Sequence, residues 1–421
     1  MITNNETAVR RVTESGSRKA VVLENGLTRV MVDDRGGMVS ELSTRVQEGY
    51  LNAHWLPYFR SNSGEAFSEA KHGSFWKANL LYEIAGSFPC VPNFGPGHEL
   101  DGIIMPPHGW SANEDWRQEK TGIDPQTGAA WCLSRMESPE RTMPLAFGKL
   151  DAVFPGESVH YASLAIENRG EFPLEINVGW HNTIGAPFLQ AGCRVSAAAE
   201  RWATVPAGSE FDDTGRLAIG AEFDSLTRAP KRTGGVCDLS VVCGPIGYTD
   251  FATGAIPSEA AIGWSAVTNP VMGLVYACFF PGPSAAGSDG IALTFNDLWM
   301  QYGGRRFTPW AAYEGGDDLS FCLGTEQAVA AYANGLSYAR EHKSLLGAPT
   351  TVTIPGRSTR KLRYGTLFSS YAEGCLNEGV DNIEGGDKEL VLKGPHRSCR
   401  LRADPRFDKL TSLERTVGLS L

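Results

Sequence analysis

The chain has 421 residues, of which 42% are hydrophobic and 20% charged, and its formal net charge at pH 7 is −10. This composition is typical of a globular chain with enough apolar material for a large core. Long basic runs are absent, which argues against a nucleic-acid partner because phosphate binding needs clustered Lys and Arg. No stretch of eighteen apolar residues occurs, so we expect no membrane-spanning helix.

The first elements predicted along the chain are short strands joined by glycine-containing turns. Residues 20–24, 28–32 and 38–42 are rich in aliphatic and β-branched side chains, which favours strands. Residues 50–125 are irregular and aromatic-rich, with clusters of Pro and Gly. A long irregular stretch inside a compact domain is usually functional, so this region is expected to line a cleft.

Strand-like alternation returns after residue 129. In the segment 174–181, Val178 and Trp180 share one face, and His181 lies on the other. We therefore expect a strand that is packed on one side only, with His181 projecting from the unpacked side. One later segment, 326–346, is predicted to be helical, and residues 350–373 are predicted to form a last pair of strands.

The 48 Gly and 24 Pro are spread along the chain and act as turn signals between many strands. Many strands, short turns and little helix predict an all-β, antiparallel sandwich. We predict one domain over residues 1–375. Residues 376–421 are more charged and less periodic, and they are expected to form a C-terminal extension that wraps the core or is partly mobile.

Nine cysteines are present, none of them in a Cys-x-x-Cys pair, and several lie in apolar runs. This pattern is typical of reduced, buried thiols in a cytosolic protein. Residues 1–6 contain no apolar stretch that would favour a signal peptide. The sequence therefore predicts a cytoplasmic location, and it leaves a homo-oligomer possible.

Five short motifs, in order, resemble those of aldose 1-epimerases. Phe-Pro-Cys-Val-Pro-Asn-Phe-Gly-Pro-Gly (88–97) and Pro-Pro-His-Gly-Trp (106–110) resemble the proline–phenylalanine–glycine and histidine–glycine–aromatic motifs of that family. Residues 167–181 are similar to its strand with the second histidine. Leu-Gly-Thr-Glu-Gln (323–327) resembles its late glutamate motif, and 352–356 its closing strand pair.

The set is nearest to the hexose-6-phosphate 1-epimerase branch, but two arginines of that branch have no counterpart. Residues 111–113 are Ser-Ala-Asn where that branch has alanine–arginine, and residues 86–87 are Gly-Ser near its other arginine position. Arginine suits phosphate because its planar fork binds two oxygens. A free sugar, or a derivative without phosphate, is therefore the expected substrate.

The resemblance implies a galactose mutarotase-like supersandwich of two large antiparallel sheets, with the sugar on a concave face. It implies Glu326 as the base that takes the anomeric proton, His181 as the acid to the ring oxygen, and His108 as a second donor. Carboxylate and imidazole suit this chemistry because both exchange protons near neutral pH. This chemistry needs no metal or organic cofactor.

Each of these three residues also has a structural alternative. Glu326 would suit the first turn of the predicted helix, where a carboxylate favours the helix dipole. His181 could be a hydrogen-bonded histidine at a strand end, and His108 a loop histidine held by backbone. Asn93 and Trp110 are candidates for sugar contact, through hydrogen bonds and stacking. A turn-forming asparagine and a core tryptophan are the alternatives.

The aromatic stretch near residue 300 adds four candidates for the same cleft: Trp299, Arg305, Arg306 and Trp310. His98, Glu99, Asp101 and His108 fit no metal-ligand spacing, so no metal is expected. Motifs of serine hydrolases, P-loop enzymes and Rossmann folds are absent. The competing functions are a carbohydrate-binding protein without catalysis, and another sugar isomerase or a lyase on the same fold.

Overall fold

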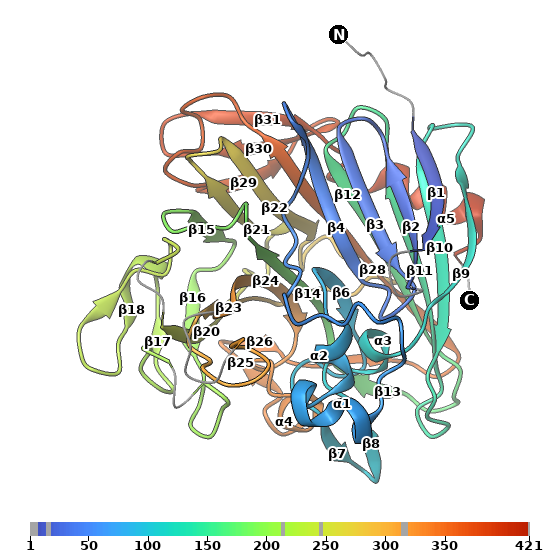
Figure 1. Cartoon of the computed structure of the whole chain (residues 1–421), viewed down its shortest axis with the longest axis horizontal. Coiled ribbons are helices and arrows are strands. Elements are labelled where there is room, and N and C mark those ends of the chain that lie inside the picture. The colour runs from blue at the N-terminus through green and yellow to red at the C-terminus, as the bar shows by residue number, and fades with distance from the viewer. Residues whose placement is uncertain (1–6, 14–17, 212–214, 244–246, 313–318, 420–421) are drawn as a thin grey trace.

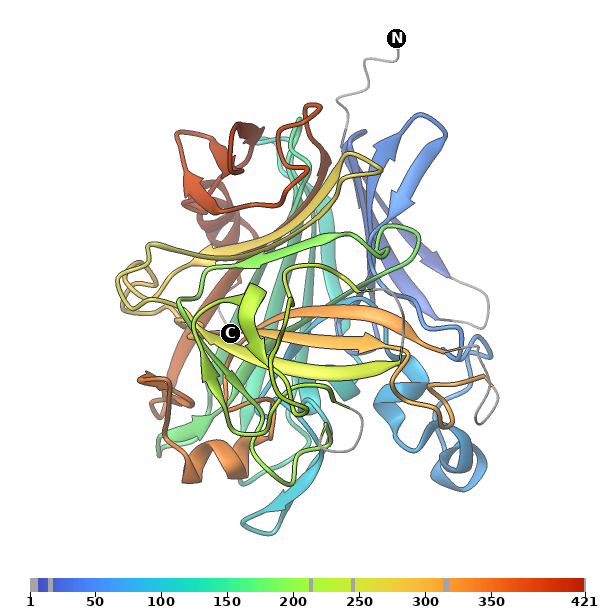
Figure 2. The same cartoon turned by 90° about the vertical axis from the view of Figure 1, so that its left-hand side faces the viewer.

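The computed structural model describes residues 7–13, 18–211, 215–243, 247–312 and 319–419. Two large antiparallel sheets make up most of it, as Figures 1 and 2 show. Within these residues there are five α-helices, the longest of them ten residues long. The prediction of an all-β fold with two large antiparallel sheets and little helix is confirmed.

The first large sheet has twelve strands in the order β1-β2-β3-β4-β6-β14-β24-β23-β20-β16-β17, with β5 paired to β4. Its strands have the following bounds: β1 Ala8–Thr13, β2 Lys19–Glu24, β3 Thr28–Asp33, β4 Val39–Val46, β5 Gly49–Asn52, β6 Ser87–Cys90, β14 Val178–Gly185, β16 Arg201–Thr204, β17 Glu222–Phe223, β20 Tyr248–Ala255, β23 Phe295–Tyr302 and β24 Phe321–Val329.

The second large sheet has eight strands in the order β15-β21-β22-β28-β12-β11-β10-β9. They are β9 Arg117–Ile123, β10 Ala130–Glu137, β11 Leu145–Val153, β12 Val159–Asn168, β15 Arg194–Ala197, β21 Ile262–Asn269, β22 Leu274–Pro281 and β28 Ser358–Ser370.

The remaining strands form small sheets: β7 His98–Leu100 with β8 Ile103–Met105, β13 Leu174–Ile176 with β27 Val352–Ile354, β18 Ala229–Pro230 with β19 Val236–Cys237, β25 Ser344–Leu345 with β26 Ala348–Pro349, and β29 Asn382–Gly385, β30 Glu389–Lys393 and β31 Ser398–Arg402 together. The helices are α1 Glu69–Trp76, α2 Asn79–Glu83, α3 Trp110–Asn113, α4 Leu336–Glu341, α5 Asp408–Val417 and the 3₁₀ turn η1 Leu226–Arg228.

Three groups of buried apolar side chains separate the layers. The first lies between the two large sheets and includes Trp180 of β14 and Leu164 of β12. The second lies between the eight-stranded sheet and the C-terminal elements, and Leu413 of α5 belongs to it. The third covers the other face of the twelve-stranded sheet, where Leu80 of α2 joins Trp299 of β23. The twelve-stranded sheet is therefore packed on both faces.

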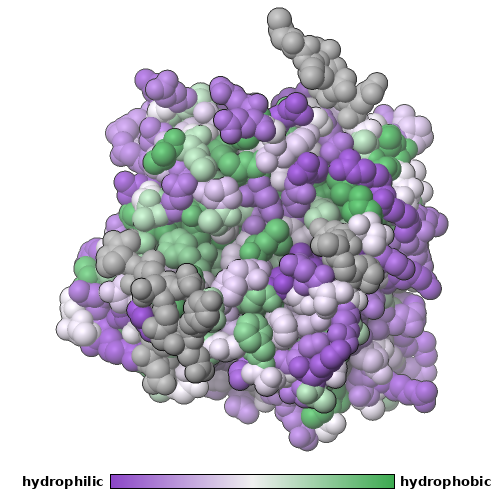
Figure 3. Space-filling view, in the orientation of Figure 1, coloured by the Kyte–Doolittle hydropathy of each residue, from purple (hydrophilic) through white to green (hydrophobic). Residues whose placement is uncertain are grey.

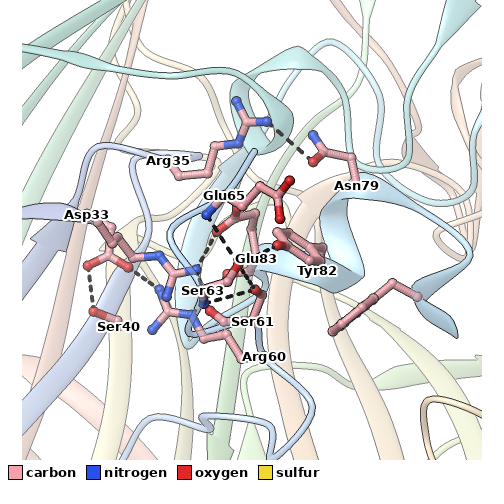
Figure 4. Close-up of polar contacts among 12 residues, drawn as sticks. Asp33, Arg35, Ser40, Arg60, Ser61, Ser63, Glu65, Asn79, Tyr82 and Glu83 are labelled. Atoms are coloured by element: carbon pink, nitrogen blue, oxygen red, sulfur yellow. Dashed lines mark hydrogen bonds and ion pairs between the residues drawn. The ribbon is translucent and has the colours of Figure 1, made fainter. Parts of the chain in front are cut away.

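Ion pairs attach the segment between β5 and β6 to the first strands (Figure 4). Arg60 pairs with Asp33, whose carboxylate also accepts a hydrogen bond of 2.8 Å from Ser40. Arg18 and Glu83 lie 2.5 Å apart, and their side chains are only 9% and 12% exposed. Because charges removed from water need close partners, these pairs connect α2 and the segment before α1 to the first strands.

The C-terminal segment is a packed layer on the eight-stranded sheet, and Figure 2 shows it above the strands of that sheet. Glu414 of α5 is 3% exposed. It accepts hydrogen bonds from Ser163 Oγ at 2.8 Å, Arg363 Nε at 2.7 Å and Lys361 Nζ at 3.1 Å. The described part of the predicted extension thus wraps the core and is tied to it by a buried ionic network.

The surface seen in Figure 3 is largely hydrophilic, with hydrophobic residues gathered in small groups. Among the described helices, none has both the length and the apolar character that crossing a membrane requires. No disulfide joins the nine cysteines, all of which lie in the described residues, and six of them are buried. Residues 1–6, on which the cytoplasmic prediction partly rests, lie outside the described residues.

Two predictions of local structure are wrong. Glu326 lies within β24, and only Leu336–Glu341 of the predicted helix 326–346 is helical. Strands pair with Gln327 and Ala328 on both sides and with Glu326 on one, so sheet packing overrides the helical tendency of this alanine-rich segment. His181 does not project from an unpacked side either. It is 3% exposed because the third core covers that face.

Candidate active site

The candidate site lies on the face of the twelve-stranded sheet that the third core covers. Asp297 of β23 is in register with Glu326 of β24. Glu326 in turn stands beside His181 of β14, which is in register with Phe88 of β6. Residues directly opposite one another on neighbouring strands point to the same face. Four consecutive strands therefore present one row of side chains: Phe88, His181, Glu326 and Asp297.

The His181 imidazole is held on three sides. Its Nε2 lies 3.1 Å from Glu326 Oε1, and its Nδ1 lies 3.1 Å from Thr183 Oγ1. The Phe88 ring stacks on it with the ring centroids 4.4 Å apart and the planes 11° from parallel. Both members of the His181–Glu326 pair are buried. The sheet thus fixes an imidazole and a carboxyl group in direct contact, which is the geometry that proton transfer needs.

Burial sets the charge of this pair. It raises the pKa of Glu326 well above its usual value, and the nearby carboxylates of Asp297 and Glu210 raise it further. It also lowers the pKa of His181 well below its usual value, and the neighbouring His108 adds to this effect. Both directions favour the uncharged forms. An uncharged pair is joined by one hydrogen bond, in which the Glu326 carboxyl group donates to His181 Nε2.

His108 approaches the pair from the loop before α3. Its φ of 57° is in the left-handed region, and its backbone N–H donates to the Gly95 carbonyl at 2.9 Å. Gly109 follows with φ 75°, and a Cβ there would lie 2.3 Å from the Val91 carbonyl oxygen, so only glycine fits. This tight turn brings the His108 ring edge-to-face against His181, with centroids 5.1 Å apart.

The His108 ring has an unused nitrogen. Its Nδ1 is buried and has no hydrogen-bond partner among the described residues. Burial lowers the pKa of His108 to about 4, so the ring is neutral at pH 7. A buried polar atom without a partner costs free energy, and such atoms are uncommon in native structures. A polar group of a ligand in the cavity could satisfy this nitrogen.

A cavity of about 400 Å³ opens over His181 and Glu326 of this row. That volume lies within the range of roughly 300–1,000 Å³ that is usual for small-molecule sites. The residues around it come from the α1–α2 segment, the loop before α3, and the sheet face with its loops: Lys77, Ala78, Leu80, Leu81, Ile84, Gly95, Pro96, Gly97, Pro107, His108, His181, Glu210, Phe211, Phe251, Trp299, Arg305, Phe307, Trp310, Glu326 and Ala333.

One wall of the cavity is aromatic. The Trp299 ring lies 5.9 Å from the His181 ring and 5.7 Å from the Trp310 ring. Trp310 stacks in parallel on Trp55 with centroids 6.2 Å apart, which fixes its orientation. The guanidinium of Arg305 lies over the Trp310 ring, 4.7 Å from its centroid. Flat apolar rings beside polar groups are the usual surroundings of a bound pyranose.

The structure brings six of the nine candidate site residues to this cavity. They are His108, His181, Glu326, Trp299, Arg305 and Trp310. Arg306 does not line it, because its side chain lies on the exposed side of the same loop. Arg305, the residue before it, is therefore the arginine of this loop that lines the cavity.

Asn93 and Trp110 do not line the cavity, and both have structural contacts instead. Asn93 is fully buried, donates to the Pro96 carbonyl at 3.0 Å and accepts from the Leu336 N–H at 2.9 Å. Trp110 is 4% exposed and belongs to the core between the two large sheets. Asn93 therefore fits the turn-forming alternative to sugar contact, and Trp110 fits the core alternative.

Sequence reasoning missed Asp297, although its surroundings carried a signal. The three polar residues of the row each have an amide neighbour on the opposite strand face: Asn182 beside His181, Gln327 beside Glu326, and Asn296 beside Asp297. Gln327 Nε2 donates to Asn296 Oδ1 at 3.1 Å, and Asn182 Nδ2 donates to the Tyr364 hydroxyl at 3.1 Å.

These amides tie the row to the eight-stranded sheet beneath it. Gln327 Nε2 also donates to Ser265 Oγ of β21 at 3.0 Å, and Tyr364 of β28 donates to Gln327 Oε1. Fully bonded polar groups in a core specify one arrangement, because any shift would leave them unpaired. Each of three apolar strands therefore contains an amide residue next to a histidine or an acid. This repeated pairing in the sequence indicates the site.

Among the described residues, no three His, Cys, Asp or Glu side chains are grouped as a metal ion would require. A second cavity, of about 640 Å³, lies between the β15–β21 edge and β29. Its lining contains the acids Glu200, Asp381 and Glu384 but no histidine. The three residues predicted for proton transfer, His108, His181 and Glu326, all line the first cavity.

Comparison with known proteins shows the fold. No family model matches the chain, and no curated protein matches its sequence. A solved structure from Klebsiella pneumoniae, provisionally named an aldose 1-epimerase, matches with a TM-score of 0.59 and 13% identity over 86% of this chain and 83% of that one. A galactose mutarotase-like protein from Clostridium acetobutylicum matches with a TM-score of 0.56 and 11% identity over 87% and 100%.

A provisionally named mutarotase from Salmonella typhimurium matches with a TM-score of 0.53 and 12% identity over 88% of this chain and 95% of that one. These identities are too low to carry an activity from one protein to another. The shared architecture extends over most of each chain. The chain therefore has the galactose mutarotase-like fold, with its histidine–glutamate pair on the covered face of the larger sheet.

Proposed function

We propose that the chain is a carbohydrate epimerase that interconverts the anomers of a free aldose or a non-phosphorylated sugar derivative. The observation that carries this proposal is the contact of 3.1 Å between His181 Nε2 and Glu326 Oε1 at the base of a cavity of small-molecule size. The cavity wall formed by Trp299 and Trp310 is suited to a pyranose face.

In the proposed reaction, the Glu326 carboxylate takes the proton of the anomeric hydroxyl while the His181 imidazolium gives its Nε2 proton to the ring oxygen. The C1–O5 bond breaks and the aldehyde forms. Rotation about C1–C2 presents the other face of the aldehyde, and the two protons return in the closing step. Positioned acids and bases of this kind contribute about 10²–10⁴-fold each.

The proton count of the ligand-free pair suits this reaction. A neutral pair and an ion pair of Glu326 and His181 contain the same single proton, so moving it between them requires no proton from solvent. Burial favours the neutral pair in the empty site. Sugar hydroxyls that hydrogen-bond to the carboxylate would favour the ion pair, because hydrogen bonds stabilise a charged group. His108 would add a contact to the ring oxygen through its unpartnered Nδ1.

The experiment is anomer exchange measured by magnetisation-transfer NMR on a panel of free aldoses, with and without the protein. Enzyme-dependent exchange on at least one sugar, abolished in Glu326→Gln, is the expected result. Calorimetric binding of a sugar without any faster exchange would instead favour the carbohydrate-binding alternative. A product of different mass or new unsaturation absorbance would favour another isomerase or a lyase.

A further inference from the structure

Arg305 is a buried cation whose role in the cavity the proposed reaction does not explain. The residue is 8% exposed and lines the cavity together with Glu326 and His181. Neither proton transfer nor stacking on a pyranose needs a guanidinium there. Burying a charge costs free energy unless it is paired, so its presence calls for a partner.

The Arg305 guanidinium is held by aromatic rings. Its Cζ lies 4.7 Å from the Trp310 centroid and 5.9 Å from both the Trp299 and Phe211 centroids. Rings that cover the faces of a guanidinium leave its edge, where the N–H donors lie, for a planar acceptor. Because Trp310 is itself stacked on Trp55, this donor edge is preorganised.

The only acid paired with Arg305 in the described part of the chain is Glu210. Glu210 Oε2 lies 3.0 Å from Arg305 Nη2, but the side chain of Glu210 is 59% exposed. The pair is also poorly aligned, since Nη2 is buried and still makes no hydrogen bond of acceptable geometry. The carboxylate of Glu210 therefore lies at the donor edge of Arg305 but leaves Nη2 without a hydrogen bond.

We propose that Arg305 binds a carboxylate of the substrate, so that the site selects aldoses that carry an acid group, such as uronates. In the empty site Glu210 holds the place that this carboxylate takes. A single guanidinium with an acid beside it matches one negative charge better than a phosphate dianion. The inference rests on the proposed function, since it names the class of sugar that the same cavity accepts.

The distances suit one sugar reaching both groups. The Trp299 ring lies 5.9 Å from the His181 ring and 5.9 Å from the Arg305 Cζ. A pyranose lying along this indole would place its anomeric end at the His181–Glu326 pair and its substituent toward Arg305. The charge of Glu210 raises the pKa of Glu326. A substrate carboxylate bound at Arg305 would therefore raise the pKa of Glu326 as well.

The test compares matched acidic and neutral sugars. Exchange and calorimetric binding are measured for galacturonate, glucuronate and an aldobiuronate against galactose, glucose and the neutral disaccharide. We expect the wild type to favour acids at least about tenfold in kcat/KM, Arg305→Met to remove that preference, and Arg306→Met to retain it. Glu210→Gln is expected to tighten binding of the acids several-fold, because it removes a competing carboxylate.

Equal treatment of acidic and neutral sugars by the wild type would overturn this inference while leaving the proposed exchange intact. Stronger selection of hexose 6-phosphates than of uronates would also overturn it, in favour of a phosphate site. If no sugar exchanges but uronates bind better than neutral sugars, and Arg305→Met removes that difference, the carboxylate site stands and the epimerase proposal fails.

Discussion

Asp297 lies directly opposite Glu326 on the adjoining strand, so two buried carboxyl groups share one face of the sheet. Burial raises the pKa of Asp297 to about 7, and its charge contributes to the raised pKa of Glu326. Asp297 is ionised mainly at and above this pH, and there removing its charge lowers the pKa of Glu326. If Glu326 acts as a base, its active form is then retained at lower pH.

Because the pKa of Glu326 is itself raised well above its usual value, we expect Asp297→Asn to move the part of the acid limb of kcat/KM that lies near and above pH 7 to lower pH, by up to about one unit. Profiles recorded on the best sugar from pH 4 to 9 would measure the shift. Asp224→Asn, at an exposed position, is the control and should leave the limb in place. An unmoved limb in Asp297→Asn, or a move to higher pH, would refute the electrostatic coupling.

The two tryptophans predicted to contact sugar should behave differently. Trp299 lines the cavity, whereas Trp110 lies in the core between the sheets. Trp299→Phe shortens a stacking surface and is expected to raise KM several-fold. Trp110→Phe should lower Tm by several degrees with KM unchanged, because it leaves a void in the core. Steady-state kinetics and thermal unfolding of both variants decide the matter, and the reverse pattern would contradict the placement.

His54 makes the stability of the fold sensitive to acid. Its ring is buried, its Nδ1 donates to the Val39 carbonyl at 2.7 Å, and burial lowers its pKa from 6.5 to about 3. Between these two pH values the unfolded chain binds a proton that the folded chain does not. This contribution to stability is therefore complete above pH 6.5 and is lost as the pH falls toward 3.

One such group should cost about 2 kcal/mol between pH 7.5 and pH 5. Urea unfolding at these two pH values would measure the loss, and His54→Gln should reduce it by that amount. His396→Gln, at the surface, should keep the loss seen in the wild type. An equal loss in wild type and His54→Gln would show that His54 makes no such contribution.

The ionic network of α5 should contribute to stability, unlike the exposed pairs nearby. Glu414 is buried against the partly exposed side chains of Arg363 and Lys361, so Glu414→Gln is expected to cost about 1–3 kcal/mol because the buried group loses its charge-assisted hydrogen bonds. Glu384→Gln breaks the exposed pair with Lys393 and should cost less than about 1 kcal/mol. Denaturant midpoints would compare them, and similar losses in the two variants would contradict the role given to α5.

The fold class and part of the site could be predicted from the sequence because both depend on local patterns. Period-two alternation correctly separated Val178 and Trp180 from His181. The same reasoning failed for Glu326, whose alanine-rich surroundings favour helix until two strands pair with β24. Local pattern also misjudged the side that His181 faces, because the segment that covers it lies about a hundred residues earlier in the chain.

The remaining errors concern which layer a side chain enters. Trp110 and Trp299 are equally apolar, and only the three-dimensional packing puts one between the sheets and the other at the cavity. Arg305 and Arg306 are neighbours in an irregular loop, where no periodicity predicts which one turns inward. Asp297 was missed because its pairing with Asn296 matches the amide pairs of His181 and Glu326 only once β14, β24 and β23 are known to be neighbours.

The most direct measurement is the exchange rate of Glu326→Gln, His181→Gln and the double variant on the best substrate, each with its folding checked by thermal unfolding. Because the two groups act on one proton cycle, each single variant should lose about 10²–10⁴-fold, and the double variant little more than the worse single one. Folded single variants that exchange anomers at the wild-type rate would contradict the account.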